Sequence, residues 1–162
     1  MGIEKTDMSV PCGDGIINIR AGAIIFKNGK MLMVKSDAAD YYYSVGGRLK
    51  MGETAAEAVV REVYEETGVK MEIDRLAFVH ENYFVGESEK KRGLPIYEIS
   101  FYYFMKVPDG FTPLCDSVTE DGHTEELCWI SPDEPMRYYP EFLRTELSHP
   151  SDNVKFFSTD DR

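Results

Sequence analysis

Three glutamates, Glu62, Glu65 and Glu66, stand three and four residues apart in a segment that favours an α-helix. At 100° per residue, their side chains share one narrow arc of the helix surface. Neighbouring carboxylates repel one another, and these lie near the helix C-terminus, where negative charge is disfavoured. A divalent cation among them would explain the arrangement, because Mg²⁺ and Mn²⁺ prefer oxygen ligands. The alternative is an acidic face that contacts only water.

Residues next to the three acids strengthen the case for a cation. Arg61 follows Glu57 by four residues and Glu53 by eight, so it can pair with either carboxylate and fix its orientation. Two adjacent glycines, Gly46 and Gly47, leave the backbone exposed, so a carbonyl can bind metal or an amide can bind phosphate. Taken singly, these features also fit a surface ion pair and a tight turn.

The acids require a helix, and the sequence supplies its start, its buried face and its end. Alanines favour a helix that begins at Glu53 or Thr54 and ends at Thr67, where Gly68 acts as the stop. An apolar stripe at helical spacing is expected to pack on a sheet. It consists of Ala56, Val59, Val60, Val63 and Thr67.

Strands are predicted on both sides of this helix. Asn28-Gly29 is a strong hairpin signal between expected strands at residues 16–26 and 31–34. An aromatic strand end at residues 41–43 leads into an expected glycine-bearing loop. The later expected elements are strands at 71–84, 95–107 and 126–130, a long polar connection at 108–123 and a helix at 140–147.

Length and composition limit the classes of protein to which the chain can belong. Its 162 residues, 43% apolar, predict a single domain over residues 1–162, with residues 1–12 expected as a disordered tail. No apolar run is long enough to span a membrane. Lys and Arg number 18 against 29 Asp and Glu, and the resulting charge of −11 disfavours nucleic acid as a partner. Three scattered cysteines predict a reduced, cytoplasmic setting.

The segment of residues 47–69 resembles the Nudix box, G-x5-E-x7-R-E-U-x-E-E-x-G-U, in which U is aliphatic. It matches every fixed position, through Gly47, Glu53, Arg61, Glu62, Val63, Glu65, Glu66, Gly68 and Val69. The resemblance implies an α/β fold, namely the Nudix α/β/α sandwich with a mixed β-sheet and a loop–helix–loop box. It also implies hydrolysis, with Mg²⁺ or Mn²⁺, of a nucleoside diphosphate linked to another moiety.

Roles follow from the resemblance position by position. The metal-binding residues would be Glu62, Glu65, Glu66 and, through its carbonyl, Gly46. Glu53 would lie behind them or bind an additional metal, with Arg61 holding the acids in place. Glu62 is the expected general base. Some family members use a later carboxylate instead, and the candidates here are Glu120, Asp121, Glu81 and Glu98.

The substrate is expected to be a small nucleoside diphosphate derivative. Tyr42 and Tyr43 could stack on its base, although packing within a strand would equally explain them. Arg48 could bind phosphate, and Glu98 is a further candidate for substrate binding. The alternative function is a Nudix-fold module that senses a nucleotide without hydrolysis, against which the intact box argues. The 12% aromatic content is compatible with a homodimer.

Overall fold

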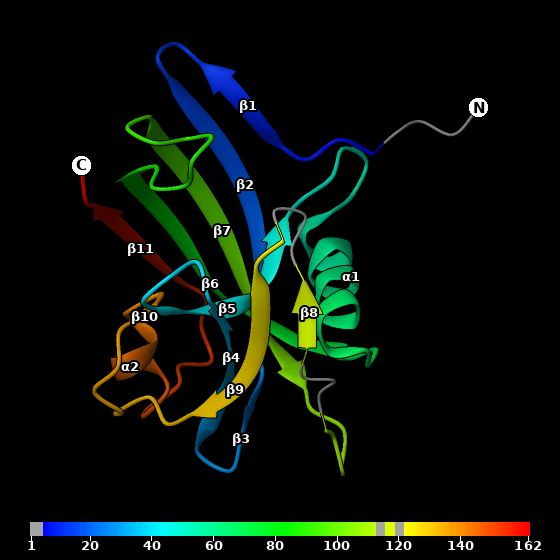
Figure 1. Ribbon diagram of the computed structural model, residues 1–162. Coiled ribbons are helices and arrows are strands. Elements are labelled where there is room, and N and C mark those ends of the chain that lie inside the picture. Colours follow the sequence, from blue (N-terminus) through cyan, green and yellow to red (C-terminus); the bar gives the residue numbers. More distant parts are fainter. Residues whose placement is uncertain (1–4, 113–115, 119–121) are drawn as a thin grey trace.

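A computed structural model describes residues 5–112, 116–118 and 122–162 of the chain (Figure 1). Eleven strands and two helices lie in this described part. The strands are β1 Ser9–Cys12, β2 Gly15–Ile24, β3 Phe26–Lys27, β4 Lys30–Ser36, β5 Tyr42–Arg48, β6 Glu72–Val85, β7 Pro95–Lys106, β8 Asp116–Val118, β9 Thr124–Ile130, β10 Tyr138–Tyr139 and β11 Lys155–Asp160. The helices are α1 Ala55–Thr67 and α2 Leu143–Glu146, and neither is long and apolar enough to cross a lipid bilayer.

The strands form one mixed sheet in the order β11-β6-β7-β2-β5-β4-β9-β8. Most neighbours are antiparallel, but β2 pairs with β7 in parallel, as do β11 with β6 and β10 with β5. The short strand β1 forms a hairpin with β2, and β3 forms one with β4. The expected mixed sheet is therefore confirmed.

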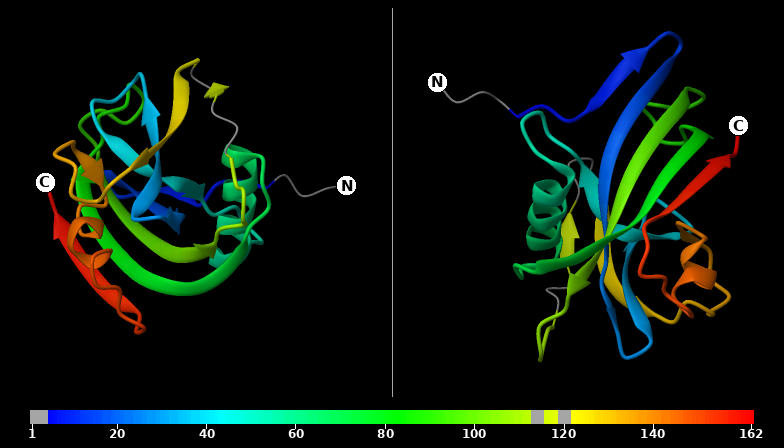
Figure 2. Two further views of the ribbon diagram at one scale, coloured as in Figure 1. Left: turned by 90° about the horizontal axis from the view of Figure 1, so that it is seen from below. Right: turned by 180° about the vertical axis from the view of Figure 1, so that it is seen from behind.

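The two helices cover opposite faces of the sheet (Figures 1 and 2). Successive residues of a strand point to opposite faces, so β2 contributes to both cores. Ala21 and Ala23 lie in the core beneath α1, whereas Ile24 lies in the core beneath α2. Leu143 of α2 joins this second core. The result is the predicted α/β/α arrangement, and "the α1 face" and "the α2 face" below denote these two sides.

The hairpin predicted at Asn28-Gly29 is present. Asn28 has φ 53° and Gly29 has φ 73°, and both residues lie in the left-handed region that a two-residue β-turn of this hand requires. The two strands that flank the turn pair Phe26 with Met31 and Lys27 with Lys30. Local turn chemistry therefore fixes the register here.

Three segments expected without regular structure contain strands. Residues 45–48, expected as a loop, continue β5 because they pair with residues 20–23 of β2. Residues 9–12, expected in a disordered tail, form β1 against β2. The polar segment after residue 148 contains β11, which pairs in parallel with β6. In all three cases, pairing with a strand distant in sequence outweighs a weak local preference.

Two other expectations differ in extent. The helix expected at residues 140–147 is reduced to Leu143–Glu146. The connection at residues 108–123 contains β8 at Asp116–Val118. The remaining expected strands agree with the structure to within a few residues, as is usual for element ends.

Candidate functional site

The ends of α1 fix which way its acidic residues point. Thr54 Oγ1 accepts the Glu57 backbone N–H at 3.2 Å, and the Glu57 carboxylate accepts the Thr54 N–H at 2.8 Å. This capping box uses Glu57, so Glu57 is not the partner of Arg61. At the other end, Gly68 adopts φ 74° and donates its N–H to the Tyr64 carbonyl at 2.9 Å. Both ends agree with the helix that the sequence predicts.

Strand β5 changes its pairing partner beside α1, and this leaves the backbone N–H of Gly46 available to a side chain. Strand β5 pairs with β4 as far as Ser44 and with β2 from Val45 onward. The Gly46 N–H donates to Glu66 Oε1 at 3.3 Å, so the α1 side chain reaches into the point of divergence. Gly46 has φ 149°, which a residue with a side chain rarely adopts. The amide of Gly46, and not its carbonyl, makes the contact with the acids.

Glu66 is a buried carboxylate with an unused oxygen. Its Oε2 is inaccessible to solvent and has no hydrogen-bond partner among the described residues. Burial, and then the charge of Glu62, raise the pKa of Glu66 to about 8. An unpaired acceptor in this environment costs on the order of 1–3 kcal/mol, so it is expected to have a partner in the working protein.

Glu62 lies against the second glycine of the pair. A Cβ atom at Gly47 would overlap the carboxylate of Glu62, so only glycine leaves room for that side chain. Burial raises the pKa of the Glu62 carboxyl, although the bond from Arg61 opposes the shift. The Glu62 side chain is 14% exposed, so it is accessible to a small ligand.

Arg61 connects four parts of the box. Its Nε and Nη2 donate to the two carboxylate oxygens of Glu53, at 2.7 and 2.9 Å. Its Nη1 donates to Glu62 Oε1 at 2.6 Å and to Glu65 Oε2 at 3.2 Å. Its Nη2 also donates to the Arg48 carbonyl at 3.1 Å. The bonds from Arg61 lower the pKa of Glu53, so this carboxylate stays ionised.

Glu65 differs from the other two acids because its side chain is half exposed and contacts Arg61. Within the described residues, no three His, Cys, Asp or Glu side chains are grouped so that they could enclose a metal ion. Glu62 and Glu66 nevertheless interact electrostatically, and Glu66 keeps one oxygen unpaired. This donor set suits a hard cation such as Mg²⁺, which is commonly held by one or two carboxylates together with substrate phosphates and water.

Glu125 on β9 is a residue of the site that the sequence analysis missed. It accepts the Tyr43 hydroxyl at 2.6 Å, and its charge contributes to the raised pKa of Glu66. The expected strand began one residue too late, at Glu126. Alternation along β9 offered the signal, because Leu127 and Trp129 both pack on the α1 face and Glu125 continues that row.

The predicted substrate residues do not form one group. Tyr43 lies on the α1 face with Glu125, where burial and the bond to Glu125 raise the pKa of its hydroxyl. Tyr42 packs against the core of the α2 face, and Lys35 Nζ lies 5.5 Å from its ring centroid. Arg48 Nη1 lies 3.7 Å from the Asp7 carboxylate.

Glu98 lies on the α2 face in a short polar row. Asn18 Nδ2 donates to Glu98 Oε2 at 3.2 Å, and Arg20 Nη1 lies 3.9 Å from Glu98 Oε1. Ser9 Oγ of β1 donates in turn to Asn18 Oδ1 at 2.6 Å. Arg20 is the second residue that the sequence analysis missed, because its proximity to Glu98 depends on parallel pairing of strands about 80 residues apart.

The other carboxylates considered as the general base lie elsewhere. Glu81 accepts hydrogen bonds from Tyr97 at 2.5 Å and from Ser158 at 2.9 Å. Glu120 and Asp121 lie outside the described residues.

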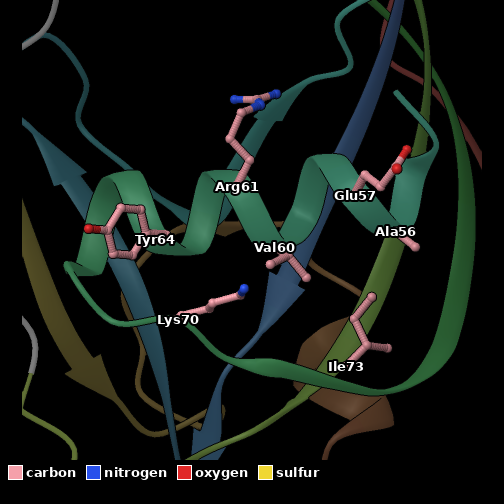
Figure 3. Close-up of a pocket in the computed structure, with 7 residues that line it drawn as sticks. All are labelled: Ala56, Glu57, Val60, Arg61, Tyr64, Lys70 and Ile73. Carbon is pink, nitrogen blue, oxygen red and sulfur yellow. The ribbon is translucent and has the colours of Figure 1, made fainter. Parts of the chain in front are cut away.

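A groove of about 610 Å³ lies along α1 and the start of β6 (Figure 3). It is lined by Ala56, Glu57, Val60, Arg61, Tyr64, Lys70 and Ile73. Ala56 and Val60, expected in the buried stripe, face this groove, and Ala58 instead takes a place in the core. The guanidinium of Arg61 points away from Ile73 in Figure 3, and none of Glu62, Glu65 and Glu66 lines the groove.

Known proteins share this sequence pattern and fold. Residues 17–150 match the family described as the NUDIX domain. A MutT-like protein of Streptomyces ambofaciens is 36% identical over 62 residues, a match covering 38% of this chain and 40% of that protein. The CTP pyrophosphohydrolase of Escherichia coli (strain K12) is 27% identical over 120 residues, which cover 72% of this chain and 77% of that protein.

A solved structure supports the same assignment at the level of the fold. The crystal structure of an ADP-ribose pyrophosphatase from Streptococcus suis 89-1591 superposes with a TM-score of 0.55 at 18% identity. The superposition covers 86% of this chain and 98% of that one. The family match spans most of the chain and includes the helix with its three acids. The chain therefore belongs to the Nudix hydrolase family.

Proposed function

We propose that residues 1–162 form a metal-dependent pyrophosphohydrolase that cleaves the diphosphate linkage of a nucleoside diphosphate derivative. The observation that carries the proposal is the buried, unpartnered Oε2 of Glu66, close to Glu62 in an intact box. A group buried at this cost in stability is typical of a functional site. The similar proteins include a CTP pyrophosphohydrolase and an ADP-ribose pyrophosphatase, which supports a small nucleotide-like substrate.

Glu62 and Glu66 would hold the cation, Mg²⁺ or Mn²⁺, with the Gly46 carbonyl and Glu65 as further ligands. The bound cation would neutralise phosphate oxygens and make a water molecule more acidic. Arg61 orients Glu62 through the 2.6 Å bond and is itself held by both oxygens of Glu53. Glu65 would have to exchange its bond to Arg61 for the metal.

Glu62 would accept the proton of the attacking water. Its carboxyl has a raised pKa, which makes it a stronger base than an exposed glutamate. The Arg61 bond occupies Oε1 and so leaves Oε2 for the water. Glu120 and Asp121 are the alternative bases, and Glu125 joins them because it lies near Glu66.

The test is release of phosphate or nucleotide from nucleoside triphosphates, dinucleoside polyphosphates, ADP-ribose and nucleotide sugars, with and without Mg²⁺ or Mn²⁺. We expect metal-dependent release from at least one class. The Glu62→Gln variant should lower kcat by on the order of 10²-fold or more with little change in KM. A variant with near-normal kcat would exclude Glu62 as the base. Tight nucleotide binding without metal-dependent release would favour the nucleotide-sensing alternative.

We also propose that Tyr42, Tyr43, Arg48 and Glu98 contribute to substrate binding. We propose a cytoplasmic location, which the few, widely spaced cysteines of the sequence support. A homodimer stays a prediction, which size-exclusion chromatography with light scattering would test.

A further inference from the structure

Arg20 on β2 carries a guanidinium whose hydrogen-bonding capacity is unused within the described chain. Its side chain is 29% exposed, and its charge contact is Glu98 Oε1 at 3.9 Å, which is too long for a hydrogen bond. The Arg20 side chain donates no hydrogen bond to any described residue. Arginine has five N–H donors in a planar fork that matches phosphate oxygens. A half-buried fork of this kind is suited to a ligand.

The neighbours of Arg20 are held in place by hydrogen bonds to other residues. Glu98 is 12% exposed and accepts the Asn18 amide at 3.2 Å through its other oxygen. Asn18 is 3% exposed and is bound in turn by Ser9. This chain, from β1 through β2 to β7, fixes the Glu98 carboxylate beside Arg20. The nearby cation Arg48 lies toward Asp7 instead.

Arg20 lies close to the acids although it belongs to the other face of the sheet. Residues 20 and 22 share one face, and a Cβ at Gly22 would meet the ring of Tyr102, a member of the α2-face core. Glu62 and Glu66 approach from the α1 face, at the point where β4 and β5 diverge. The charges of both carboxylates nevertheless act on Arg20. Geometry gives the same proximity: Gly46, whose N–H binds Glu66, pairs with Gly22 of β2, two residues from Arg20.

We propose that Arg20 binds a non-bridging phosphate oxygen of the substrate diphosphate, while Glu98, held by Asn18, positions the guanidinium. The inference rests on the proposed function, because it requires a phosphate-bearing ligand at Glu62 and Glu66. The ligand would be anchored from two sides, by a cation at the carboxylates and by Arg20. A diphosphate suits this arrangement because it presents several anionic oxygens. A ligand with a single carboxylate has too few anionic oxygens to contact both the cation and Arg20.

The test is binding of α,β-methylene ADP, whose bridge resists hydrolysis, measured by calorimetry with Mg²⁺ present. Arg20→Gln should raise Kd at least tenfold, and Arg20→Lys, which keeps the charge but not the fork, should show an intermediate loss. Binding of Mn²⁺ alone, followed by electron paramagnetic resonance, should be unchanged in both variants. Arg92→Gln, at an exposed arginine of the β6–β7 turn, is the matched control and should bind like wild type.

The positioning role of Glu98 is tested by a double-mutant cycle. Glu98→Gln should weaken analogue binding in the wild-type background and have little further effect in the Arg20→Gln background. A Glu98 that only supports the fold would instead lower binding equally in both backgrounds. Inorganic pyrophosphate should report the same loss for Arg20→Gln as the nucleotide analogue does. A loss confined to the nucleotide would place Arg20 at the base and overturn the inference.

Failure of the inference and failure of the proposed function give different results. If wild type hydrolyses diphosphates but folded Arg20→Gln binds the analogue normally, the inference is wrong and the function stands. If wild type binds the analogue in an Arg20-dependent way but releases no product, the inference stands and the function is wrong. Should Arg20→Gln fail to fold, Arg20→Lys decides, and wild-type affinity in that variant overturns the inference.

Discussion

Arg61 donates one hydrogen bond to each carboxylate oxygen of Glu53, at 2.7 and 2.9 Å, although Glu53 lies eight residues earlier in the chain. The same guanidinium contacts Glu62, so the orientation of that carboxylate depends on a residue in the loop before the helix. This relationship ties the loop and the helix of the Nudix box into one unit. It predicts that activity falls when the planar guanidinium of Arg61 is replaced, even if the positive charge is kept.

Arg61→Lys therefore tests the fork. A lysine ammonium cannot bind both oxygens of Glu53 while contacting Glu62. We expect turnover to fall by about 10–100-fold, as is usual when a residue that orients metal ligands is changed. The free energy of unfolding should fall by about 1.5–3 kcal/mol, because charged hydrogen bonds are lost. Steady-state kinetics and urea denaturation measure the two effects. Arg162→Lys, in an exposed pair with Asp160, is the control and should change neither.

Glu66→Gln should make the metal-free protein more stable and its metal response weaker. The Glu66 carboxyl is buried with its Oε2 unpartnered, and its pKa is raised to about 8. At neutral pH, folding therefore requires this group either to take up a proton or to bury a charge, and both oppose folding. Glutamine keeps the shape without the charge. We expect a higher Tm than wild type in the presence of EDTA, and a smaller rise in Tm when Mn²⁺ is added.

Glu65→Gln is the matched control for this change, because the Glu65 side chain is half exposed. It should leave the metal-free Tm almost unchanged. If Glu66→Gln lowers the metal-free Tm instead, Glu66 has a partner that stabilises its charge, and the assignment of its free oxygen to a cation loses its basis.

Gly47→Ala should separate activity from folding. The added Cβ would overlap the Glu62 carboxylate, whereas the backbone at this position is not in the left-handed region. Glu62 would have to move away from its bond to Arg61. We expect a higher Mn²⁺ concentration for half-maximal activity and a lower kcat, with cooperative unfolding retained. Unchanged metal dependence would show that Glu62 is free to move without consequence.

His80 should make stability depend on pH between about 5 and 7. It is 8% exposed, its Nε2 lies 2.8 Å from Thr159 Oγ1, and its ring contacts Phe142. Burial lowers the pKa of His80 below its model-compound value of 6.5, although the charges of Glu98 and Asp161 oppose this. The folded protein therefore binds fewer protons at this residue than the unfolded chain.

The stability contributed by neutral His80 should accordingly be complete above pH 6.5 and decline as the pH falls through that value. His80→Gln removes the titration. Urea midpoints of both proteins from pH 5 to 8 measure the difference between them. The wild-type midpoint should fall more steeply toward pH 5, and parallel curves would contradict the role assigned to His80.

Local sequence signals predicted the parts of the site that lie close together in the chain. The ends of α1 and the phase of its acids depend on residues close together in the chain, so periodicity and turn chemistry suffice. For Arg61 the sequence left two partners open, Glu57 and Glu53, and the structure selects Glu53. The same holds for the hairpin at residues 28–29, where both backbone angles follow from residue type.

The missed parts depend on contacts between distant segments. β11 is a short strand in a mostly polar segment, and it forms because it pairs in parallel with β6. Two glycines in β5 disfavour a strand locally, but pairing with β2 outweighs that preference. Arg20 and Glu98 meet through the parallel register of β2 and β7. Of the missed residues, only Glu125 could have been predicted from the sequence, by extending the alternation of β9 by one position.

The two-faced use of β2 has a consequence for how such a protein can diversify. Asn18 and Arg20 form a polar row with Glu98 on one side of the strand, while Ala21 and Ala23 fill the core under α1 on the other. With Arg20 in the proposed role, exchanging this polar row would alter recognition and leave the support of the helical acids intact. Substitutions on the polar side of β2 could thus change which ligand is preferred during evolution. The other side of the strand would keep supporting the helix that carries the acids.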